Sequence, residues 1–215
     1  MALAPPAATA QPPGFEPAPL LLPWDLRLTP EQFEQVCQAN SQAVLELTAD
    51  GLVVVMTPTG GETGPRCLRL GQRLLAWADG TGDGAWVAFD SSTGFQLADG
   101  SVLSPDLSLL RRDRWQGLSP EQRRRFPPLS PDLVIVLVNP SDSGPRSITA
   151  LRRKMDLYQA NGARLGWLLL PQERAVEIWR AGQQVMAQRL ENANRLDGSE
   201  LAEELALGLE DIWVV

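Results

Sequence analysis

The chain has 215 residues, of which 44% are hydrophobic and 21% charged, and this composition is ordinary for one globular domain with a buried core. Its net charge of −7 argues against a generic nucleic-acid binder, which usually has an overall basic surface, although a local basic patch is compatible with it. The chain contains no histidine, so a metal ion would have to be held by carboxylates, and such ligands favour magnesium or manganese.

The N-terminal segment predicts a tail rather than a targeting signal. Residues 1–24 are rich in alanine and proline, which indicates disorder, and we expect a single domain over residues 25–215. The segment has no positively charged start and is broken by prolines, so it is a poor signal peptide. No apolar run approaches the ~20 residues of a membrane helix, and we expect a cytoplasmic protein without membrane contact. Cys37 and Cys67 are too few for a disulfide scaffold and lack the spacing of a zinc site.

The first half of the chain predicts helices alternating with β-hairpins. Thr29 is the expected N-cap of a helix, with Pro30 at its first position and Gln32 closing a capping box. A hairpin turning at Asp50-Gly51 follows. The next elements are a helix over 62–79 with Leu68, Leu75 and Trp77 among its apolar positions, a strand over 84–90, and a second hairpin over 93–110 that turns at 98–100.

The second half predicts a strand–helix–strand unit. Residues 111–131 form a polar, arginine-rich connection with one or two short helical turns. The apolar run 132–138 is typical of a central strand buried on both faces. A helix over 147–161 and two further strands, 164–171 and 175–180, follow before an acidic C-terminal segment. Together these elements predict an α/β fold, with an α+β mixed sheet flanked by helices.

Two acidic side chains on predicted strands are candidates for chemistry. Strict alternation puts Ser104, Asp106 and Ser108 on one face of their strand and the leucines on the other. A carboxylate between two hydroxyls is a reasonable metal ligand, and it is equally typical of any half-exposed strand. Glu46 alternates with two leucines in the same way, and on this pattern alone it is a surface residue.

The chain contains one lysine, Lys154, among 19 lysine and arginine residues, and one tyrosine, Tyr158, four residues later. Three apolar residues of this helix form one stripe with the tyrosine, namely Ile148, Leu151 and Met155. Lys154 lies at the border of that stripe, from where it can lay its methylenes on the core and present its ammonium along the sheet. Either it is a solvated surface lysine, or it does what a guanidinium cannot do beside a phosphate.

Four stretches in order resemble the Uma-type putative restriction endonuclease family: LELTADGLVVVMTPTGGETG, FDSSTGFQLADGSVLSPDLSLL, FPPLSPDLVIVLVNPSDS and LRRKMDLYQANGARLGWLLLPQERAVEIWR. The resemblance covers roughly residues 28–190. It implies the fold of the PD-(D/E)XK nuclease superfamily, a restriction-endonuclease-like core. It also implies metal-dependent hydrolysis of phosphodiester bonds, with Mg²⁺ or Mn²⁺ as cofactor.

Carried over residue by residue, the resemblance assigns three roles. Asp106 matches the aspartate of the "PD" motif, preceded here by Pro105, and Glu46 matches the upstream acidic residue; both are implied metal ligands and catalytic residues. Lys154 matches the catalytic lysine, which in this family has moved to the helix. That lysine stabilises charge or assists the attacking water.

One departure from the family pattern concerns the second motif carboxylate. Where the family has a glutamate in the strand, this chain has Val136, and both same-face neighbours are also valines. Asp132 has the correct parity but lies about 13 Å away along the strand. Asn139 has the opposite parity, and Asp142 lies beyond the strand and would need a loop that folds back. We therefore expect a metal site that lacks one carboxylate.

Arginines bracket the predicted site and could bind phosphate groups. They are Arg111, Arg112, Arg114, Arg123, Arg124 and Arg125 between two strands, and Arg152 and Arg153 beside Lys154. Arginines on one rim would hold phosphates despite the overall acidity, whereas charge runs are more commonly solvated surfaces. Nucleic-acid contacts are expected above all from Arg123, Arg124, Arg152 and Arg153.

The sequence leaves three functions open. The first is a magnesium-dependent endonuclease acting on DNA through Asp106, Lys154 and Glu46. The second is a non-catalytic relative that binds nucleic acid or a protein partner. The third is a homo-oligomeric scaffold in which the site no longer matters. Metal titration separates the first from the others, and salt-dependent binding to DNA separates the second from the third.

Overall fold

Helices cover both faces of a six-stranded sheet in a computed structural model of the chain, which describes residues 22–23, 25–183, 186 and 188–214. The predicted tail, residues 1–24, falls almost entirely outside this part of the chain, so the division into a tail and one domain stays a prediction. No helix among the described residues has the length and apolar character needed to cross a membrane.

The main sheet has the strand order β10-β9-β8-β7-β6-β3. Its strands are β3 (Trp86–Asp90), β6 (Leu107–Arg111), β7 (Leu133–Leu137), β8 (Leu165–Leu170), β9 (Ala175–Arg180) and β10 (Gln188–Glu191). β7 and β8 are parallel and the other neighbours antiparallel. Parallel neighbours need a crossover, and α5 (Pro145–Ala160) supplies it, so the predicted strand–helix–strand unit is confirmed.

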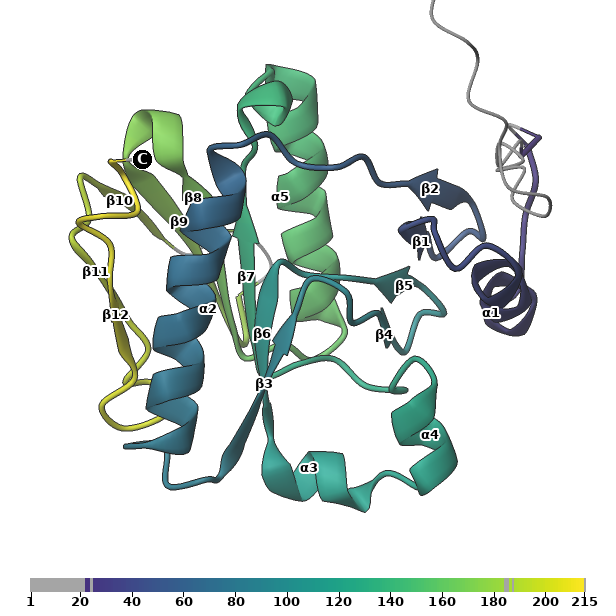
Figure 1. The fold of residues 1–215 in the computed structure, drawn as a ribbon, viewed down its shortest axis with the longest axis horizontal. Coiled ribbons are helices and arrows are strands. Elements are labelled where there is room, and N and C mark those ends of the chain that lie inside the picture. Colours follow the sequence, from purple (N-terminus) through teal and green to yellow (C-terminus); the bar gives the residue numbers. More distant parts are fainter. Residues whose placement is uncertain (1–21, 24, 184–185, 187, 215) are drawn as a thin grey trace, which may run out of the picture.

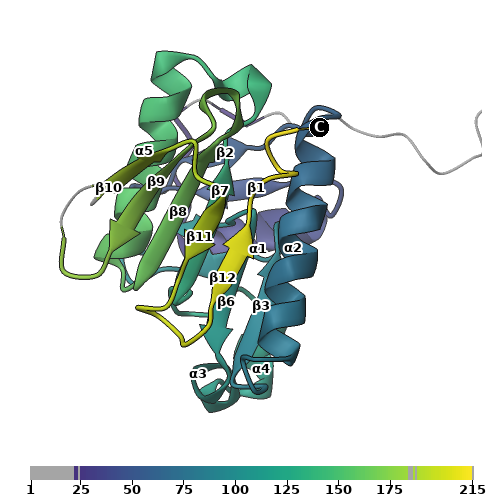
Figure 2. The ribbon, with the colours of Figure 1, turned by 90° about the vertical axis from the view of Figure 1, so that its left-hand side faces the viewer.

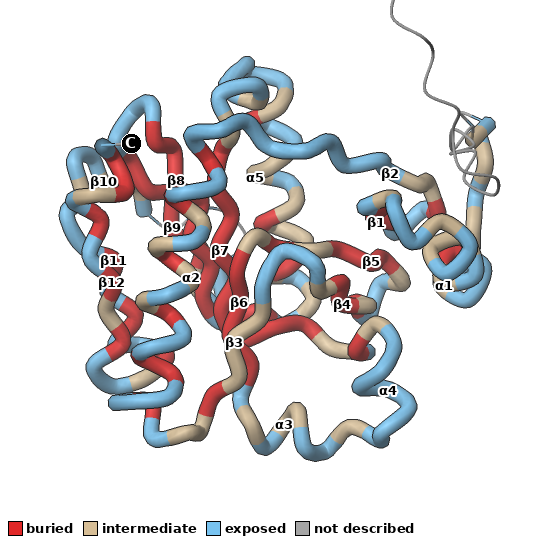
Figure 3. Tube along the Cα trace, viewed as in Figure 1, coloured by how far each residue is buried: buried red, intermediate tan, exposed pale blue. Residues whose placement is uncertain are grey.

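Two apolar layers form on the faces of β7, because its side chains alternate. Leu133, Ile135 and Leu137 belong to the core cluster under α2 (Thr63–Asp79), and Val134, Val136 and Val138 to the cluster under α5. The two helices lie on opposite faces of the sheet (Figure 2). Every residue of the strand is buried, which confirms the predicted central strand (Figure 3).

A second, four-stranded sheet lies beside the main one with the order β2-β1-β5-β4. Its strands are β1 (Leu45–Leu47), β2 (Val53–Val55), β4 (Phe95–Gln96) and β5 (Val102–Leu103), and α1 (Pro30–Ala39) packs on it. The predicted capping box is present: Thr29 Oγ1 accepts from the backbone N–H of Gln32, and Gln32 Oε1 accepts from that of Thr29. The hairpin at Asp50-Gly51 is confirmed as β1–β2.

The second hairpin, predicted over 93–110, does not continue as one strand after its turn, so that part of the prediction is wrong. β5 pairs with β1 and β4 in the small sheet, and β6 pairs with β3 and β7 in the main sheet. Leu103 belongs to the α5 cluster, whereas Leu107 and Leu109 belong to the α2 cluster, so these leucines do not share a face. Pro105 has no N–H to donate to a ladder, and the chain leaves one sheet for the other at this point. Asp106 therefore lies at the junction of the two sheets.

The remaining elements include the predicted helical turns, and they differ from the prediction in the C-terminal segment and in the exposure of two leucines of the second helix. The predicted helical turns are α3 (Arg112–Gly117) and α4 (Pro120–Arg124), and two 3-10 turns are η1 (Pro140–Asp142) and η2 (Pro171–Glu173). The C-terminal segment forms an unpredicted two-stranded sheet, β11 (Arg195–Asp197) and β12 (Ala206–Gly208), that packs near α2. Leu68 and Leu75, predicted among the apolar positions of the second helix, are 76% and 51% exposed.

Candidate active site

The predicted lysine and upstream glutamate are in direct contact. Lys154 Nζ lies 2.6 Å from Glu46 Oε1 and donates a second hydrogen bond, of 2.8 Å, to the Ser104 carbonyl. The backbone N–H of Ser104 donates to the same Glu46 oxygen at 2.7 Å. α5 thus contributes the cation, β1 the carboxylate, and the chain after β5 joins them.

The surface interpretation of Glu46 is wrong. The residue is 5% exposed, and the side chain of Lys154 is 13% exposed. β1 is only three residues long, so alternation along it could not reveal that β5 and α5 cover its glutamate. The carboxylate is buried with its cation, as buried charges must be.

Asp106 directly precedes β6, close enough to this ion pair for both of its charges to act on the aspartate. Its Oδ2 accepts a 2.7 Å hydrogen bond from the backbone N–H of Leu137. Burial raises the pKa of Asp106, and the charges of Glu46 and Asp142 raise it further, while the Leu137 N–H and the ammonium of Lys154 lower it. The structure therefore brings Asp106, Glu46 and Lys154 within one electrostatic environment.

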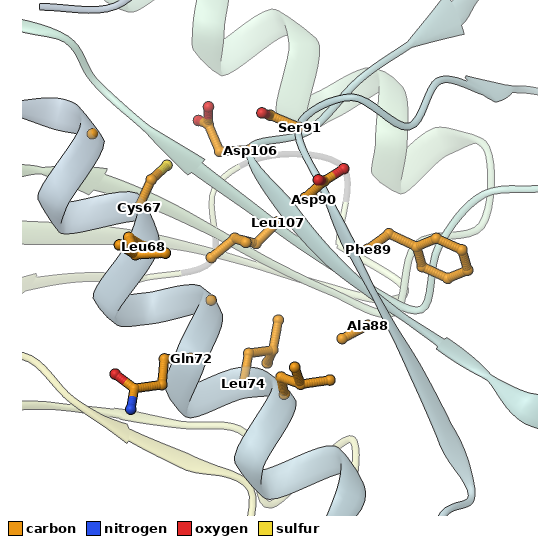
Figure 4. A pocket seen from close by; sticks show the side chains of 13 residues that line it. Cys67, Leu68, Gln72, Leu74, Ala88, Phe89, Asp90, Ser91, Asp106 and Leu107 are labelled. Carbon is orange, nitrogen blue, oxygen red and sulfur yellow. The ribbon is translucent and has the colours of Figure 1, made fainter.

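A cavity of about 610 Å³ opens between α2, β3 and β6. Its walls are mainly apolar, and Asp106 lies at one end with Asp90 and Ser91, opposite Cys67 and Leu68 of α2 (Figure 4). Burial, together with the charge of Asp106, raises the pKa of Cys67 to about 12, so its thiol stays protonated. The residues found to line this cavity include Asp106 and neither Glu46 nor Lys154.

Val136 occupies the place predicted for the missing carboxylate. The pair Leu107 and Ile135 is in register, so the next position puts Asp106 opposite Val136. Val136 is 3% exposed and packs in the α5 cluster. Its side chain is therefore on the Lys154 side of the sheet and surrounded by apolar groups.

The two acidic residues weighed as replacements have different surroundings. Asp132 is 2% exposed and lies at the other end of β7, where it pairs with Arg114 at 2.7 Å and accepts from the Arg111 N–H at 2.9 Å. Asp142 lies in η1, shortly after β7, and its charge is one of those that raise the pKa of Asp106. Asn139 Nδ2 donates to Asp142 at 3.1 Å. η1 therefore holds Asp142 beside Asn139.

The residues present do not complete a divalent-cation site. Within the described part of the chain, no three acidic or cysteine side chains are grouped so that they could hold a metal ion. One oxygen of Glu46 is already taken by Lys154 and Ser104, and position 136 supplies no oxygen. Magnesium and manganese prefer several oxygen ligands at close range.

The arginines predicted to bind phosphate separate into engaged and exposed groups. Arg152 forms a two-pronged contact with Glu177. At the far end of β6 from Asp106, Arg111 donates to Asp113, and Arg112 donates to backbone carbonyl groups. Arg153, Arg123 and Arg124 are exposed. Arg124 and Arg125 line a second cavity, of about 390 Å³, together with Ser92 and Thr93.

Sequence reasoning assigned no role to two groups around this site. The Ser104 backbone holds both members of the ion pair, and only the break between β5 and β6 explains why it is available. The hydroxyl of Tyr158 is buried near Glu46 and Asp106, whose charges add to the effect of burial in raising its pKa. Its position one turn after Lys154 was the available signal.

Comparison with known proteins places this geometry in context. The family model described as "Uma2: Putative restriction endonuclease" matches residues 30–212. The chain is also similar in structure to a putative nuclease belonging to DUF820 from Anabaena variabilis ATCC 29413, with a TM-score of 0.67 and 17% identity. That likeness covers 87% of this chain and 99% of the other, and it confirms the predicted mixed sheet with a restriction-endonuclease-like core. No curated protein matches the chain.

Proposed function

The chain belongs to the Uma2 family of putative restriction endonucleases, and from this membership we propose that its site acts on phosphodiester bonds in DNA with an incomplete cation site. Asp106, Glu46 and Lys154 are the proposed catalytic residues, and the first two are the proposed metal ligands. Because position 136 is a valine, we expect weak binding of magnesium or manganese and slow cleavage or none.

The contact between Lys154 and Glu46 beside Asp106 is the observation that carries this proposal. Lys154 Nζ lies 2.6 Å from the carboxylate of Glu46, and its charge also acts on Asp106. It is therefore a compact cation at the junction of the two sheets. An ammonium is a compact point charge with three rotatable donors, whereas a guanidinium is a larger planar fork, so the two cations occupy a narrow buried space differently. The 18 other cationic side chains of this chain are arginines, so the lysine is the exception at this place.

The proposed reaction is hydrolysis by water. The water oxygen forms a bond to phosphorus, the bond from phosphorus to the leaving oxygen breaks, and a proton from the attacking water ends on the leaving oxygen or in solvent. Lys154 offsets the negative charge that develops on the phosphate oxygens. Asp106 and Glu46 orient the water by accepting its hydrogen bonds.

Substitution of Val136 by glutamate tests the proposal. Without metal, Val136→Glu should lower the free energy of unfolding by about 2 kcal/mol, because it buries a carboxylate among apolar groups. With magnesium or manganese, stability should recover by linkage, and DNA cleavage should appear or rise. Thermal unfolding with and without metal, and a nuclease assay, measure both effects.

Two outcomes would contradict the proposal. One is efficient cleavage by the unmodified protein that depends on Asp106. The other is an equal loss of stability in Val136→Glu with and without metal. The matched control is Asp106→Asn in the Val136→Glu background, which should abolish the gain in cleavage while keeping the Leu137 N–H satisfied.

A non-catalytic nucleic-acid-binding role is the second candidate, and the apolar packing of Val136 favours it. Arg124 is exposed and lines the second cavity together with Ser92 and Thr93, so it is one candidate phosphate contact. This role predicts DNA binding that weakens steeply with salt and needs no metal. A protein partner or a homo-oligomeric scaffold would instead show neither cation binding nor salt-dependent DNA binding.

A further inference from the structure

Two hydroxyl groups near the site are buried. Tyr158 is 1% exposed and Ser108 is 0% exposed, and within the described residues neither side-chain oxygen has a hydrogen-bond partner. The large majority of buried polar groups in native proteins are bonded to protein or to ordered water. We therefore expect each of these two oxygens to form a hydrogen bond with a water or a ligand.

Both hydroxyls lie in the layer between the main sheet and α5. Leu107 and Leu109 point into the α2 cluster, so Ser108 between them points to the opposite face. Ser108 is in register with Val134, which belongs to the same core cluster as Tyr158. This shared layer also contains Val136.

Tyr158 lies one turn of α5 after Lys154, the cation of the ion pair. It follows Lys154 by four residues, so both side chains lie on the same side of the helix. Burial, and then the charges of Glu46 and Asp106, raise the pKa of Tyr158 well above its ordinary value. The hydroxyl is thus a neutral donor on the same side of α5 as Lys154, and the charges of both carboxylates act on it.

We propose that Tyr158 binds and orients an ordered water between Glu46 and Asp106, and that this water is the one that attacks phosphorus. The second clause rests on the proposed function. A water that accepts from the tyrosine hydroxyl and donates to both carboxylates keeps one lone pair free for attack. Glu46 has an oxygen for it, because the contacts with Lys154 and Ser104 use Oε1 and the described residues donate no hydrogen bond to Oε2. Asp106 likewise accepts from Leu137 through Oδ2.

High-resolution crystal structures of the full chain and of Tyr158→Phe test the water site. We expect a water within hydrogen-bond distance, roughly 2.6–3.2 Å, of the tyrosine oxygen and of at least one carboxylate. In Tyr158→Phe this water should be lost while the contact between Lys154 and Glu46 persists. A dry layer, or a tyrosine hydroxyl bonded to a protein atom, overturns the proposal.

Kinetics in the Val136→Glu background test the role of the water. Adding Tyr158→Phe should lower kcat at least about 10-fold and leave KM within about 2-fold, because a misplaced nucleophile slows the chemical step without weakening DNA binding. The matched control is Met155→Leu, which changes a buried side chain of the same helix face without touching a hydroxyl, and it should leave both constants unchanged.

The outcomes separate this inference from the proposed function. Equal kcat with and without the tyrosine hydroxyl, in a variant that cleaves DNA, overturns the attacking role alone. Absence of cleavage in every variant overturns the proposed function and the attacking role together. The presence or absence of water density beside Tyr158 in the crystal structures still decides the water site.

Discussion

α5 holds two buried carboxylates through cations only two residues apart, and the two contacts are built differently. Arg152 binds Glu177 of β9, and Lys154 binds Glu46 of β1. Both glutamates are nearly or fully buried, at 0% and 5% exposure. The helix therefore connects the main sheet to the small sheet through two ion pairs of the same general kind.

The Arg152 contact is saturated. Arg152 donates to Glu177 Oε2 at 2.8 Å and to Oε1 at 2.5 Å, and Arg189 of β10 donates to Oε1 at 2.9 Å. Although burial opposes the effect, these two arginines lower the pKa of Glu177. Both carboxylate oxygens are occupied, so this cluster has no place left for a ligand.

The Lys154 contact is unsaturated. It uses one oxygen of Glu46, and nearby lie Asp106, whose pKa is raised, and Tyr158, whose hydroxyl finds no partner among the described residues. The difference indicates that the arginine cluster stabilises the fold, whereas the lysine cluster retains free polar groups for a ligand or water. Unsatisfied groups of this kind persist mainly where function requires them.

The largest expected effect is on the saturated cluster. Glu177→Gln should lower the free energy of unfolding by about 3 kcal/mol, because it removes a buried charge from between two arginines. DNA and metal binding should be unchanged. Urea denaturation measures the loss, and Glu46→Gln is the matched variant, for which we expect a smaller loss. A larger loss at Glu46 would contradict the comparison.

Exchange of the two cations tests whether their chemistry matters. Lys154→Arg and Arg152→Lys should each cost about 1–2 kcal/mol, because a guanidinium does not fit the ammonium site and an ammonium cannot make the two-pronged contact. Arg152→Lys should leave any cleavage of DNA intact, while Lys154→Arg should abolish it. Equal effects of both exchanges on cleavage would show that the lysine has no special role.

The raised pKa of Asp106 predicts a stability cost that depends on pH. A carboxyl whose pKa is higher in the folded state binds protons more tightly there, so its contribution to stability is lost as pH rises from the ordinary carboxyl range through the raised value. Asp106→Asn should therefore stabilise the protein by about 1 kcal/mol at neutral pH and have little effect at acid pH. Glu177→Gln should show the opposite trend, since the pKa of Glu177 is lowered. Melting temperatures measured across pH for both variants check the two signs.

Much of this fold was predictable because local signals agreed with it. The capping box at Thr29, the Asp50-Gly51 turn and the apolar run 132–138 each specify an element through short-range chemistry or a single buried surface. The split between β5 and β6 was not predictable from alternation, since the period of two continues through Pro105 while the chain changes sheets. Register within a sheet depends on partners that are distant in sequence.

The site was predictable only in part, for the same reason. The resemblance identified Asp106, Lys154 and Glu46, and residue patterns placed Lys154 at the border of its apolar stripe. Burial of Glu46 depends on contacts 58 and 108 residues away in sequence, which no local pattern contains. These three residues are the proposed site, and the variants described above test their roles.

The smallest expected effect on stability concerns Arg153, the neighbour of both cations. Arg153 is exposed, so Arg153→Ala should change the free energy of unfolding by no more than about 0.5 kcal/mol.

If Arg153 contacts a DNA phosphate, its removal should weaken binding uniformly across sequences and reduce the salt dependence of binding by about one counterion. Arg152→Ala should lower the free energy of unfolding and leave the salt dependence of DNA binding unchanged, because the Arg152 guanidinium is already bound to Glu177. Arg195→Ala, at an exposed position on β11, is the control for a loss of one positive charge. DNA binding measured from low to moderate salt separates these cases, and a slope that falls equally in Arg153→Ala and Arg195→Ala would show only a general charge effect.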